Sequence, residues 1–170
     1  MDENHETDPV TEELLAWIGG TVRHLAASTA GLTEQQLRTP VTSSGWTILG
    51  LVEHVRDSTV FWLENVVLGV PAEMDDEAWD NDPAARGAEV IERLRVDTAR
   101  ACEAVAHVAS TASPGWWPEG AWGGYRQDEV RGVLVHLLND NAAHTGQMDL
   151  ARESIDGAVW DFSVGGVRVP

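Results

Sequence analysis

Four polar side chains interrupt the apolar pattern near the C-terminal end of the chain. They follow one another at spacings of four, four and three residues: His136, Asp140, His144 and Gln147. At about 100° per residue, a helix places all four within an arc of about 80° on one face. Apolar residues flank that arc, so the stripe borders the core. A histidine one helical turn from a carboxylate has the spacing of two metal ligands, because one turn brings both side chains to a common point.

A third ligand is available earlier in the chain. His54 lies between Leu51 and Val55, on or beside the apolar face of its own helical pattern. Metal sites in helical bundles take their ligands from facing helices. One histidine from this segment and two groups from the polar stripe would form a three-ligand site with an open fourth position.

These residues also have a structural interpretation. A histidine beside a core is commonly held by hydrogen bonds without a metal, and Asp140 would pair with a histidine one turn away. His5 lies in a terminal segment, and His24 and His107 have no inward polar neighbours, so all three are assigned to structure or solvent. Cys102 lies among small apolar residues and is interpreted as a core side chain.

Helical periodicity accounts for most of the chain. Apolar side chains recur at helical spacing in four stretches, which predict helices over about 10–30, 46–68, 84–112 and 126–155. The connections are a linker over 32–44, an acidic surface loop over 72–83 and a loop rich in tryptophan and glycine over 113–124. Four long helices with such long connections predict an all-α four-helix bundle. The predicted organisation is a flexible N-terminal tail (1–9), one bundle domain (10–155) and a C-terminal tail (156–170), where the only strand-like alternation occurs.

Composition restricts the function. The 170 residues carry 11 basic and 28 acidic side chains, a net charge of −17. This charge excludes binding along nucleic-acid phosphates and docking on anionic membranes. One cysteine forms no intrachain disulfide and no cysteine-rich zinc site, and the absence of lysine excludes Schiff-base chemistry. The N-terminus is acidic, unlike a signal peptide, and no apolar run reaches about 18 residues, so we expect a cytoplasmic protein without a membrane span.

Tryptophan is unusually frequent, with eight residues against two phenylalanines and one tyrosine. Several of these aromatics lie just before the polar stripe: Trp116, Trp117, Trp122 and Tyr125. They are expected either to floor a pocket at one end of the stripe or to cap the bundle core. In the first case, Arg126 or Arg131 would hold a carboxylate of a bound molecule.

Two segments resemble one protein family. Residues 45–54 (GWTILGLVEH) resemble the helix-two signature, and residues 133–147 (VLVHLLNDNAAHTGQ) the helix-four signature, of the DinB-like superfamily. The resemblance is greatest to the branch that includes mycothiol-dependent enzymes, the DinB/YfiT-type metal-binding four-helix bundles. It implies a bundle, often a homodimer, that binds a divalent metal through His54, Asp140 and His144. The middle ligand is commonly Glu in this branch, so the shorter Asp140 leaves His136 as the alternative third ligand, while Gln147 matches a His-x-Gly-Gln variant.

The resemblance also implies a function. Relatives are metal-dependent transferases or isomerases. They bind two small molecules, a low-molecular-weight thiol and an electrophile. Zinc is the expected metal, with nickel, manganese or iron as alternatives. Mycothiol is the first thiol expected, because a lysine-free composition rich in arginine and alanine is typical of high-GC bacteria; glutathione and bacillithiol follow. The alternatives are a non-catalytic, stress-related, metal-binding dimer and a pocket recruited for a biosynthetic substrate.

Overall fold

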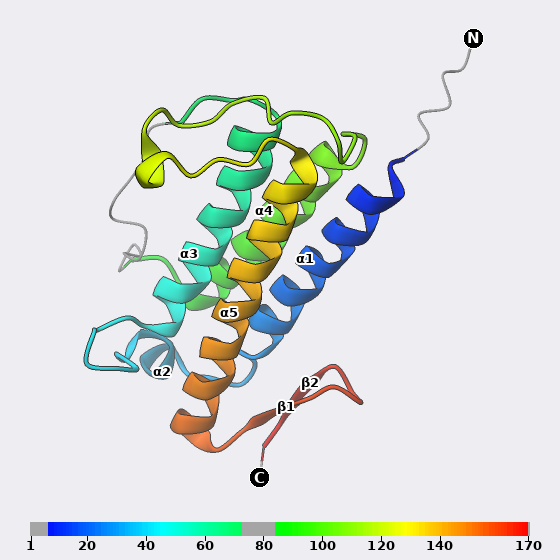
Figure 1. Cartoon of the computed structure of the whole chain (residues 1–170). Helices are drawn as coiled ribbons and strands as arrows, with labels where there is room; N and C mark the ends of the chain where they lie inside the picture. Colours follow the sequence, from blue (N-terminus) through cyan, green and yellow to red (C-terminus); the bar gives the residue numbers. More distant parts are fainter. Residues whose placement is uncertain (1–6, 73–83, 170) are drawn as a thin grey trace.

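Four long helices lie side by side, with a short hairpin near one end of the molecule (Figure 1). The computed structural model describes residues 7–72 and 84–169. The helices are α1 (Pro9–Ala27), α2 (Glu34–Arg38), α3 (Ile48–Val60), the π-helix η1 (Phe61–Val67), α4 (Gly87–Val105), the 3₁₀ turn η2 (Ala121–Gly124) and α5 (Val130–Asp156). The strands β1 (Val159–Asp161) and β2 (Gly166–Arg168) pair antiparallel.

The start of α1 is held by one carboxylate. Asp8 Oδ1 accepts hydrogen bonds from the backbone N–H groups of Val10 at 2.9 Å and Thr11 at 3.2 Å. These bonds satisfy two of the donors that a helix N-terminus leaves free. The second oxygen, Oδ2, accepts from the backbone N–H of Ser110 at 2.8 Å. Asp8 therefore both caps α1 and ties it to the loop that follows α4.

The helix α3 begins at a threonine cap and continues without a break into η1. Thr47 Oγ1 accepts from the Gly50 N–H at 3.0 Å, which stabilises the first turn. From Phe61 onward the helix widens to the π form, in which the hydrogen bonds span five residues. The wider turn sets the direction of the side chains within it, including Trp62, which is buried.

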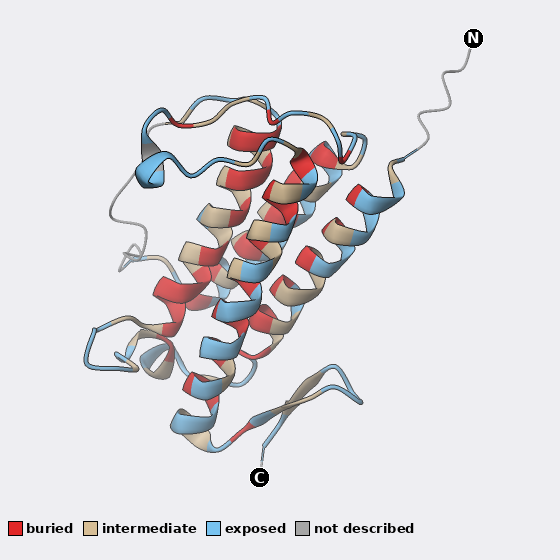
Figure 2. Cartoon of the chain, viewed as in Figure 1, coloured by how far each residue is buried: buried red, intermediate tan, exposed pale blue. Residues whose placement is uncertain are grey.

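Two apolar clusters form the core, and the inward faces of the helices are buried along their length (Figure 2). The first cluster, near the α2 end, includes Val22, Leu25, Leu51, Val52, Val55, Leu94 and Met148. The second cluster, near the tryptophan-rich loop, includes Leu15, Ile18, Trp62, Leu63, Val105, Leu134 and Leu137. This much buried apolar surface stabilises the bundle independently of a bound ion.

Buried polar side chains lie between these clusters. Thr59 on α3, Thr98 on α4 and Asn141 on α5 each fall between a residue of the first cluster and one of the second along their own helix. Asn141 Nδ2 donates to Thr59 Oγ1 at 3.3 Å, and Thr145 Oγ1 donates to the Asn141 carbonyl at 2.7 Å. The middle of the bundle therefore carries polar groups that periodicity alone places at its edge.

The predicted all-α bundle is confirmed, with three differences in detail. The short helix α2 lies in the predicted linker, where Thr33 and Gln36 form a reciprocal capping box. The helix α4 ends at Val105 rather than near 112, because the next residues turn to meet Asp8. The C-terminal tail forms a hairpin. Residues 1–6 of the predicted tail and 73–83 of the predicted acidic loop lie outside the described residues.

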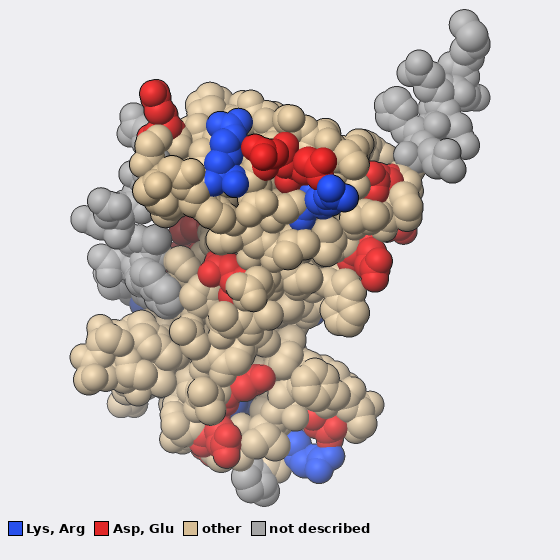
Figure 3. Space-filling view, in the orientation of Figure 1, with Lys and Arg blue, Asp and Glu red and all other residues tan. Residues whose placement is uncertain are grey.

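Arginines on the surface lie next to acidic side chains, as on the face shown in Figure 3. Within the described residues, every arginine except Arg23 and Arg126 has a carboxylate oxygen within 4.0 Å. In a chain with so many acidic groups, an arginine without such a partner is the exception. None of the helices described here is long and apolar enough to span a membrane.

Candidate metal centre

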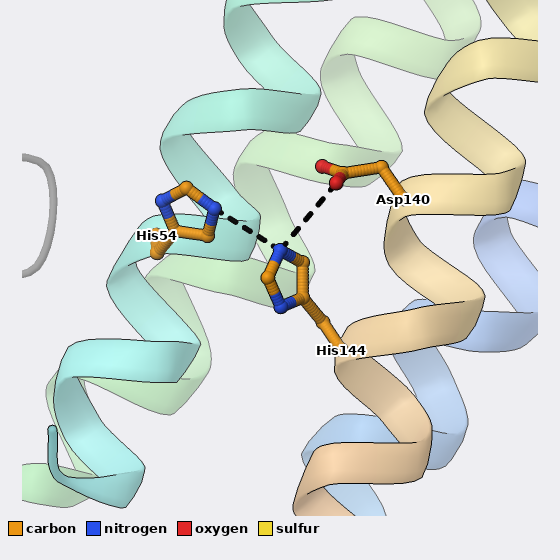
Figure 4. A group of neighbouring side chains, drawn as sticks. All are labelled: His54, Asp140 and His144. Carbon is orange, nitrogen blue, oxygen red and sulfur yellow. Dashed lines mark hydrogen bonds and ion pairs between the residues drawn. The ribbon is translucent and has the colours of Figure 1, made fainter. Parts of the chain in front are cut away.

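His54, Asp140 and His144 meet between α3 and α5 (Figure 4). The Nε2 atoms of His54 and His144 are 3.1 Å apart. His144 Nε2 is 3.6 Å from Asp140 Oδ1. One ligand atom from each residue lies within 4.8 Å of the other two. We call these three residues the trio. No other group of three His, Cys, Asp or Glu side chains in residues 7–72 and 84–169 has this arrangement.

Gln147 determines which nitrogen of His144 is available. Its side-chain oxygen Oε1 lies 2.9 Å from His144 Nδ1, so Nδ1 carries the proton and donates it to this oxygen. The lone pair is then on Nε2, the atom that faces the other two members of the trio (Figure 4). A hydrogen bond of this kind is what orients a histidine that binds a metal. Gln147, predicted as part of the stripe, is therefore a positioning residue.

The donor set fits a divalent cation. With His144 in this tautomer, its Nε2 and the Asp140 carboxylate are both acceptors, and a cation bound between them would satisfy both. Two nitrogens at about 2.1 Å from a tetrahedral ion are roughly 3.4 Å apart. The 3.1 and 3.6 Å separations in the trio lie on either side of that value. Imidazole and carboxylate ligands suit zinc and other first-row divalent metals.

The trio is buried on one side and open on the other. The side chain of His144 retains 11% of its exposure, whereas that of Asp140 retains 35%. Ser58, one turn after His54 on α3, donates from Oγ to Asp140 Oδ2 at 3.3 Å. Ser58 was not identified from the sequence, although its spacing of four residues from His54 was a usable signal. The partial exposure of Asp140 leaves the trio in contact with solvent on that side.

His136 lies apart from the trio. Its ring packs against Trp62 with the centroids 4.6 Å apart, and its Nδ1 lies 3.4 Å from the Tyr125 hydroxyl. Gln127 Nε2 donates to that hydroxyl at 2.7 Å, which leaves the Tyr125 proton free to point to His136. The structure therefore brings Asp140, and not His136, next to the two histidines.

An aromatic cluster continues from His136 toward the end of the bundle. Trp62 stacks on Trp122 with the ring centroids 5.3 Å apart, and its ring centroid lies 5.5 Å from that of Trp117. Trp122 is the one non-glycine among the described residues with positive φ, at 49°, a conformation that costs free energy and is found more often at functional sites. Trp116 and Trp117 pack on the core, as the expectation of a cap on the bundle requires, whereas Trp122 and Tyr125 are exposed.

Cys102 belongs neither to the trio nor to the aromatic cluster. Burial raises the pKa of its thiol to about 11, although the positive charge of Arg23 opposes the shift. A thiol with so high a pKa stays protonated and unreactive near neutral pH. The interpretation of Cys102 as a core residue agrees with this environment.

An all-α bundle with two histidines and a carboxylate gathered from two facing helices defines a DinB-like bundle with a candidate metal site. The family model for mycothiol-S-transferase matches residues 13–157. The chain therefore belongs to the mycothiol S-transferase family, and this membership supports a mycothiol-related transferase. Comparisons with curated proteins and with solved structures yield no match.

Proposed function

We propose that the protein transfers a low-molecular-weight thiol, mycothiol first, to an electrophile at a metal held by the trio. The observation that carries this proposal is the approach of His54 Nε2, His144 Nε2 and Asp140 Oδ1 to one another. Two neutral imidazoles and one carboxylate leave a divalent cation with a net charge of +1. Zinc is the metal proposed, and nickel, manganese or iron suit the same ligands.

A divalent cation in this position stabilises the thiolate form of a bound thiol and so supplies a nucleophilic sulfur at neutral pH. The chain contributes the positions of the groups around it. Gln147 keeps the lone pair of His144 on Nε2, and Ser58 holds the carboxylate of Asp140. The raised pKa of Cys102 is consistent with a sulfur nucleophile that comes from the co-substrate.

In the transfer step, the sulfur forms a bond to the electrophilic carbon. The leaving group departs with the bonding electron pair, and the thiol proton passes to solvent. In an isomerisation, the sulfur would add to a double bond and later leave, which regenerates the thiol. The family membership favours transfer as the reaction of this chain.

The electrophile is proposed to bind on the aromatic cluster. Trp62 packs against His136, which lies one helical turn from Asp140, and Trp122 stacks on Trp62. Beyond them, Trp117, Tyr125 and Arg126 line a cavity of about 330 Å³. The Arg126 guanidinium lies 5.9 Å from the Trp117 ring centre, whereas Arg131 pairs with Glu129 at 2.5 Å. Arg126 is thus the cation proposed to hold a carboxylate, and planar aromatic electrophiles are the proposed class.

Elemental analysis followed by thermal unfolding with thiols tests the proposal. The purified protein should carry about one divalent metal per chain. A thiol that binds only the folded state adds RT ln(1 + [L]/Kd), about 2.7 kcal/mol at a hundredfold excess over Kd. That is several degrees in Tm for a domain of this size. Metal-loaded protein that shows no shift with mycothiol, glutathione or bacillithiol would instead be a metal-binding protein without this reaction.

A further inference from the structure

A large cavity in the protein shares no lining residue with the trio. It has a volume of about 790 Å³ and lies between α1 and α4, next to the C-terminal hairpin. The hairpin lies beside the C-terminal half of α1 (Figure 1). None of the trio or the aromatic cluster lines this cavity. Its size is that of a pocket for a small organic molecule.

The polar lining is basic. Arg23, His24 and Arg95 line the cavity, and no carboxylate of the described residues does. This is unusual for a chain with 28 acidic side chains. Arg95 has only a distant contact with Glu92, at 3.7 Å, and Arg23 has no ion pair within the described residues. A guanidinium without a carboxylate partner is free to bind an external anion.

Two glycines in the middle of α1 make space for the Arg23 guanidinium. A Cβ at Gly19 would lie 3.2 Å from Arg23 Nη1, and a Cβ at Gly20 would lie 3.8 Å from Nη2. Consecutive glycines weaken a helix interior, so this position has a cost that alanine would avoid. The glycine pair gives the cavity a flat backbone wall along which the guanidinium lies.

Two more donors in the lining have no acceptor. Thr98 Oγ1 and Trp160 Nε1 are both buried, and neither has a hydrogen-bond partner in the part of the chain described here. Thr98 as a whole is 4% exposed. The Trp160 ring stacks on His24 at 3.7 Å, and His24 Nε2 lies 2.9 Å from Asp149 Oδ1, so the indole is held in place. Buried donors are normally paired, so these two require an acceptor.

We propose that this cavity is a second binding site, for a small organic anion with an aromatic or apolar body. A carboxylate would accept from the Arg23 guanidinium and, after a small movement of the lining, from Thr98 Oγ1 and Trp160 Nε1, whose donor atoms are covered in this structure. The ligand body would lie against the glycine pair and the apolar walls of α1 and α4. The site is independent of the metal, because no residue of the trio contributes to it.

NMR titration of ¹⁵N-labelled protein with 2-naphthoate tests the site. Each tryptophan gives one indole N–H signal, and Trp160→Phe identifies the one from Trp160. Naphthoate should shift that signal to saturation. The uncharged 2-naphthamide should bind with an affinity at least about tenfold lower. Inorganic phosphate should have little effect, since it cannot use the apolar walls. Equal binding of naphthamide, or equal binding of phosphate, overturns the assignment to an organic anion.

Variants locate the binding. Arg23→Gln should weaken naphthoate about tenfold, and Thr98→Val about threefold to tenfold, without moving the other indole signals. Arg86→Gln is the control for loss of an arginine, because Arg86 pairs with Glu89 on the surface and does not line this cavity. The His144→Ala variant should bind naphthoate at Trp160 as the wild type does, which separates this site from the proposed reaction. Unchanged affinity in Arg23→Gln, or loss of binding in His144→Ala, overturns the proposal.

Discussion

The Nε2 atoms of His54 and His144 lie 3.1 Å apart although 90 residues separate them in the chain. Two helices from different halves of the sequence are therefore packed so that two imidazole nitrogens face each other. Asp140 adds a carboxylate one turn from His144, so the trio would offer a cation three ligands. This relationship makes the metal content of the protein the first quantity to measure.

Removing either histidine should remove the metal. We expect His54→Ala and His144→Ala to lower the bound metal far below one per chain, because each leaves two ligands at most. The far-ultraviolet circular dichroism should remain helical, since the two apolar clusters do not need the ion. Elemental analysis gives the metal content, with His107→Ala as the control for loss of a histidine elsewhere. Full occupancy in both variants would show that the trio is not the site.

The third ligand is tested by comparing Asp140→Asn with His136→Ala. Asp140→Asn should lower metal affinity by more than the roughly 10- to 100-fold that loss of a supporting hydrogen bond costs. His136→Ala should leave the affinity nearly unchanged, because its ring packs against Trp62 rather than facing the trio. Competition with a chelator of known affinity measures both. The opposite order would make His136 the ligand.

Periodicity was sufficient to predict the bundle and the stripe, because one face of a long helix repeats every 3.6 residues whatever lies opposite. It also placed His54 on a facing helix. It could not choose between Asp140 and His136, since both lie one turn from a residue of the stripe. That choice depends on how α3 and α5 pack, which puts His54 level with His144 and Trp62 level with His136.

Other features depend on contacts that no local pattern contains. The π-helical turn after Val60 determines where Trp62 points, and its residues are ordinary helix residues in sequence. The hairpin forms against α1, where Trp160 stacks on His24, a histidine that showed no polar neighbours in its own helix. Asp149, which pairs with His24, lies on α5, 125 residues further along the chain.

The carboxylate of Asp8 makes the free energy of unfolding depend on pH. The hydrogen bond from the Ser110 backbone N–H holds the pKa of Asp8 below its usual 3.8. A lowered carboxyl pKa contributes stability that is fully present above 3.8 and is lost as pH falls through the folded value. Asp8→Asn keeps an oxygen for the cap but loses the acceptor for Ser110. The variant should unfold at a lower temperature than the wild type at pH 5 to 7.

This difference should begin to shrink below about pH 3.8, where the unfolded chain starts to bind a proton at Asp8, and should disappear once the pH is below the lowered pKa of the folded state. Thermal unfolding at pH 7, 5 and 3.5 measures it. Glu12→Gln, which removes a charge from the same first turn without touching Ser110, is the matched control. A gap between Asp8→Asn and wild type that stays constant down to pH 3 contradicts the role given to the carboxylate.

Cys102 should resist alkylation. With the pKa of the thiol raised from 9.0 to about 11 by burial, the thiolate fraction at pH 8 is about a hundredfold lower than in the unfolded chain. Iodoacetamide should therefore label the folded protein at most about one hundredth as fast as the protein in urea, as followed by mass spectrometry. Cys102→Ala should keep its metal and its mycothiol-dependent shift in Tm. Labelling at the rate of the unfolded chain would show an exposed, reactive thiol.

The aromatic cluster is tested through the electrophile. Trp122 has a φ of 49°, which glycine adopts without strain, so Trp122→Gly removes the indole and keeps the turn. Loss of one ring contact of about 0.5–1.5 kcal/mol should raise KM for 1-chloro-2,4-dinitrobenzene about twofold to tenfold. The KM for iodoacetamide, which has no ring, should change little, and kcat should change little for both, because the contact forms before the reaction begins. Trp17→Ala, which removes an exposed indole on α1, is the control. An equal rise in KM for both electrophiles would mean that Trp122 shapes the loop rather than binding an aromatic substrate.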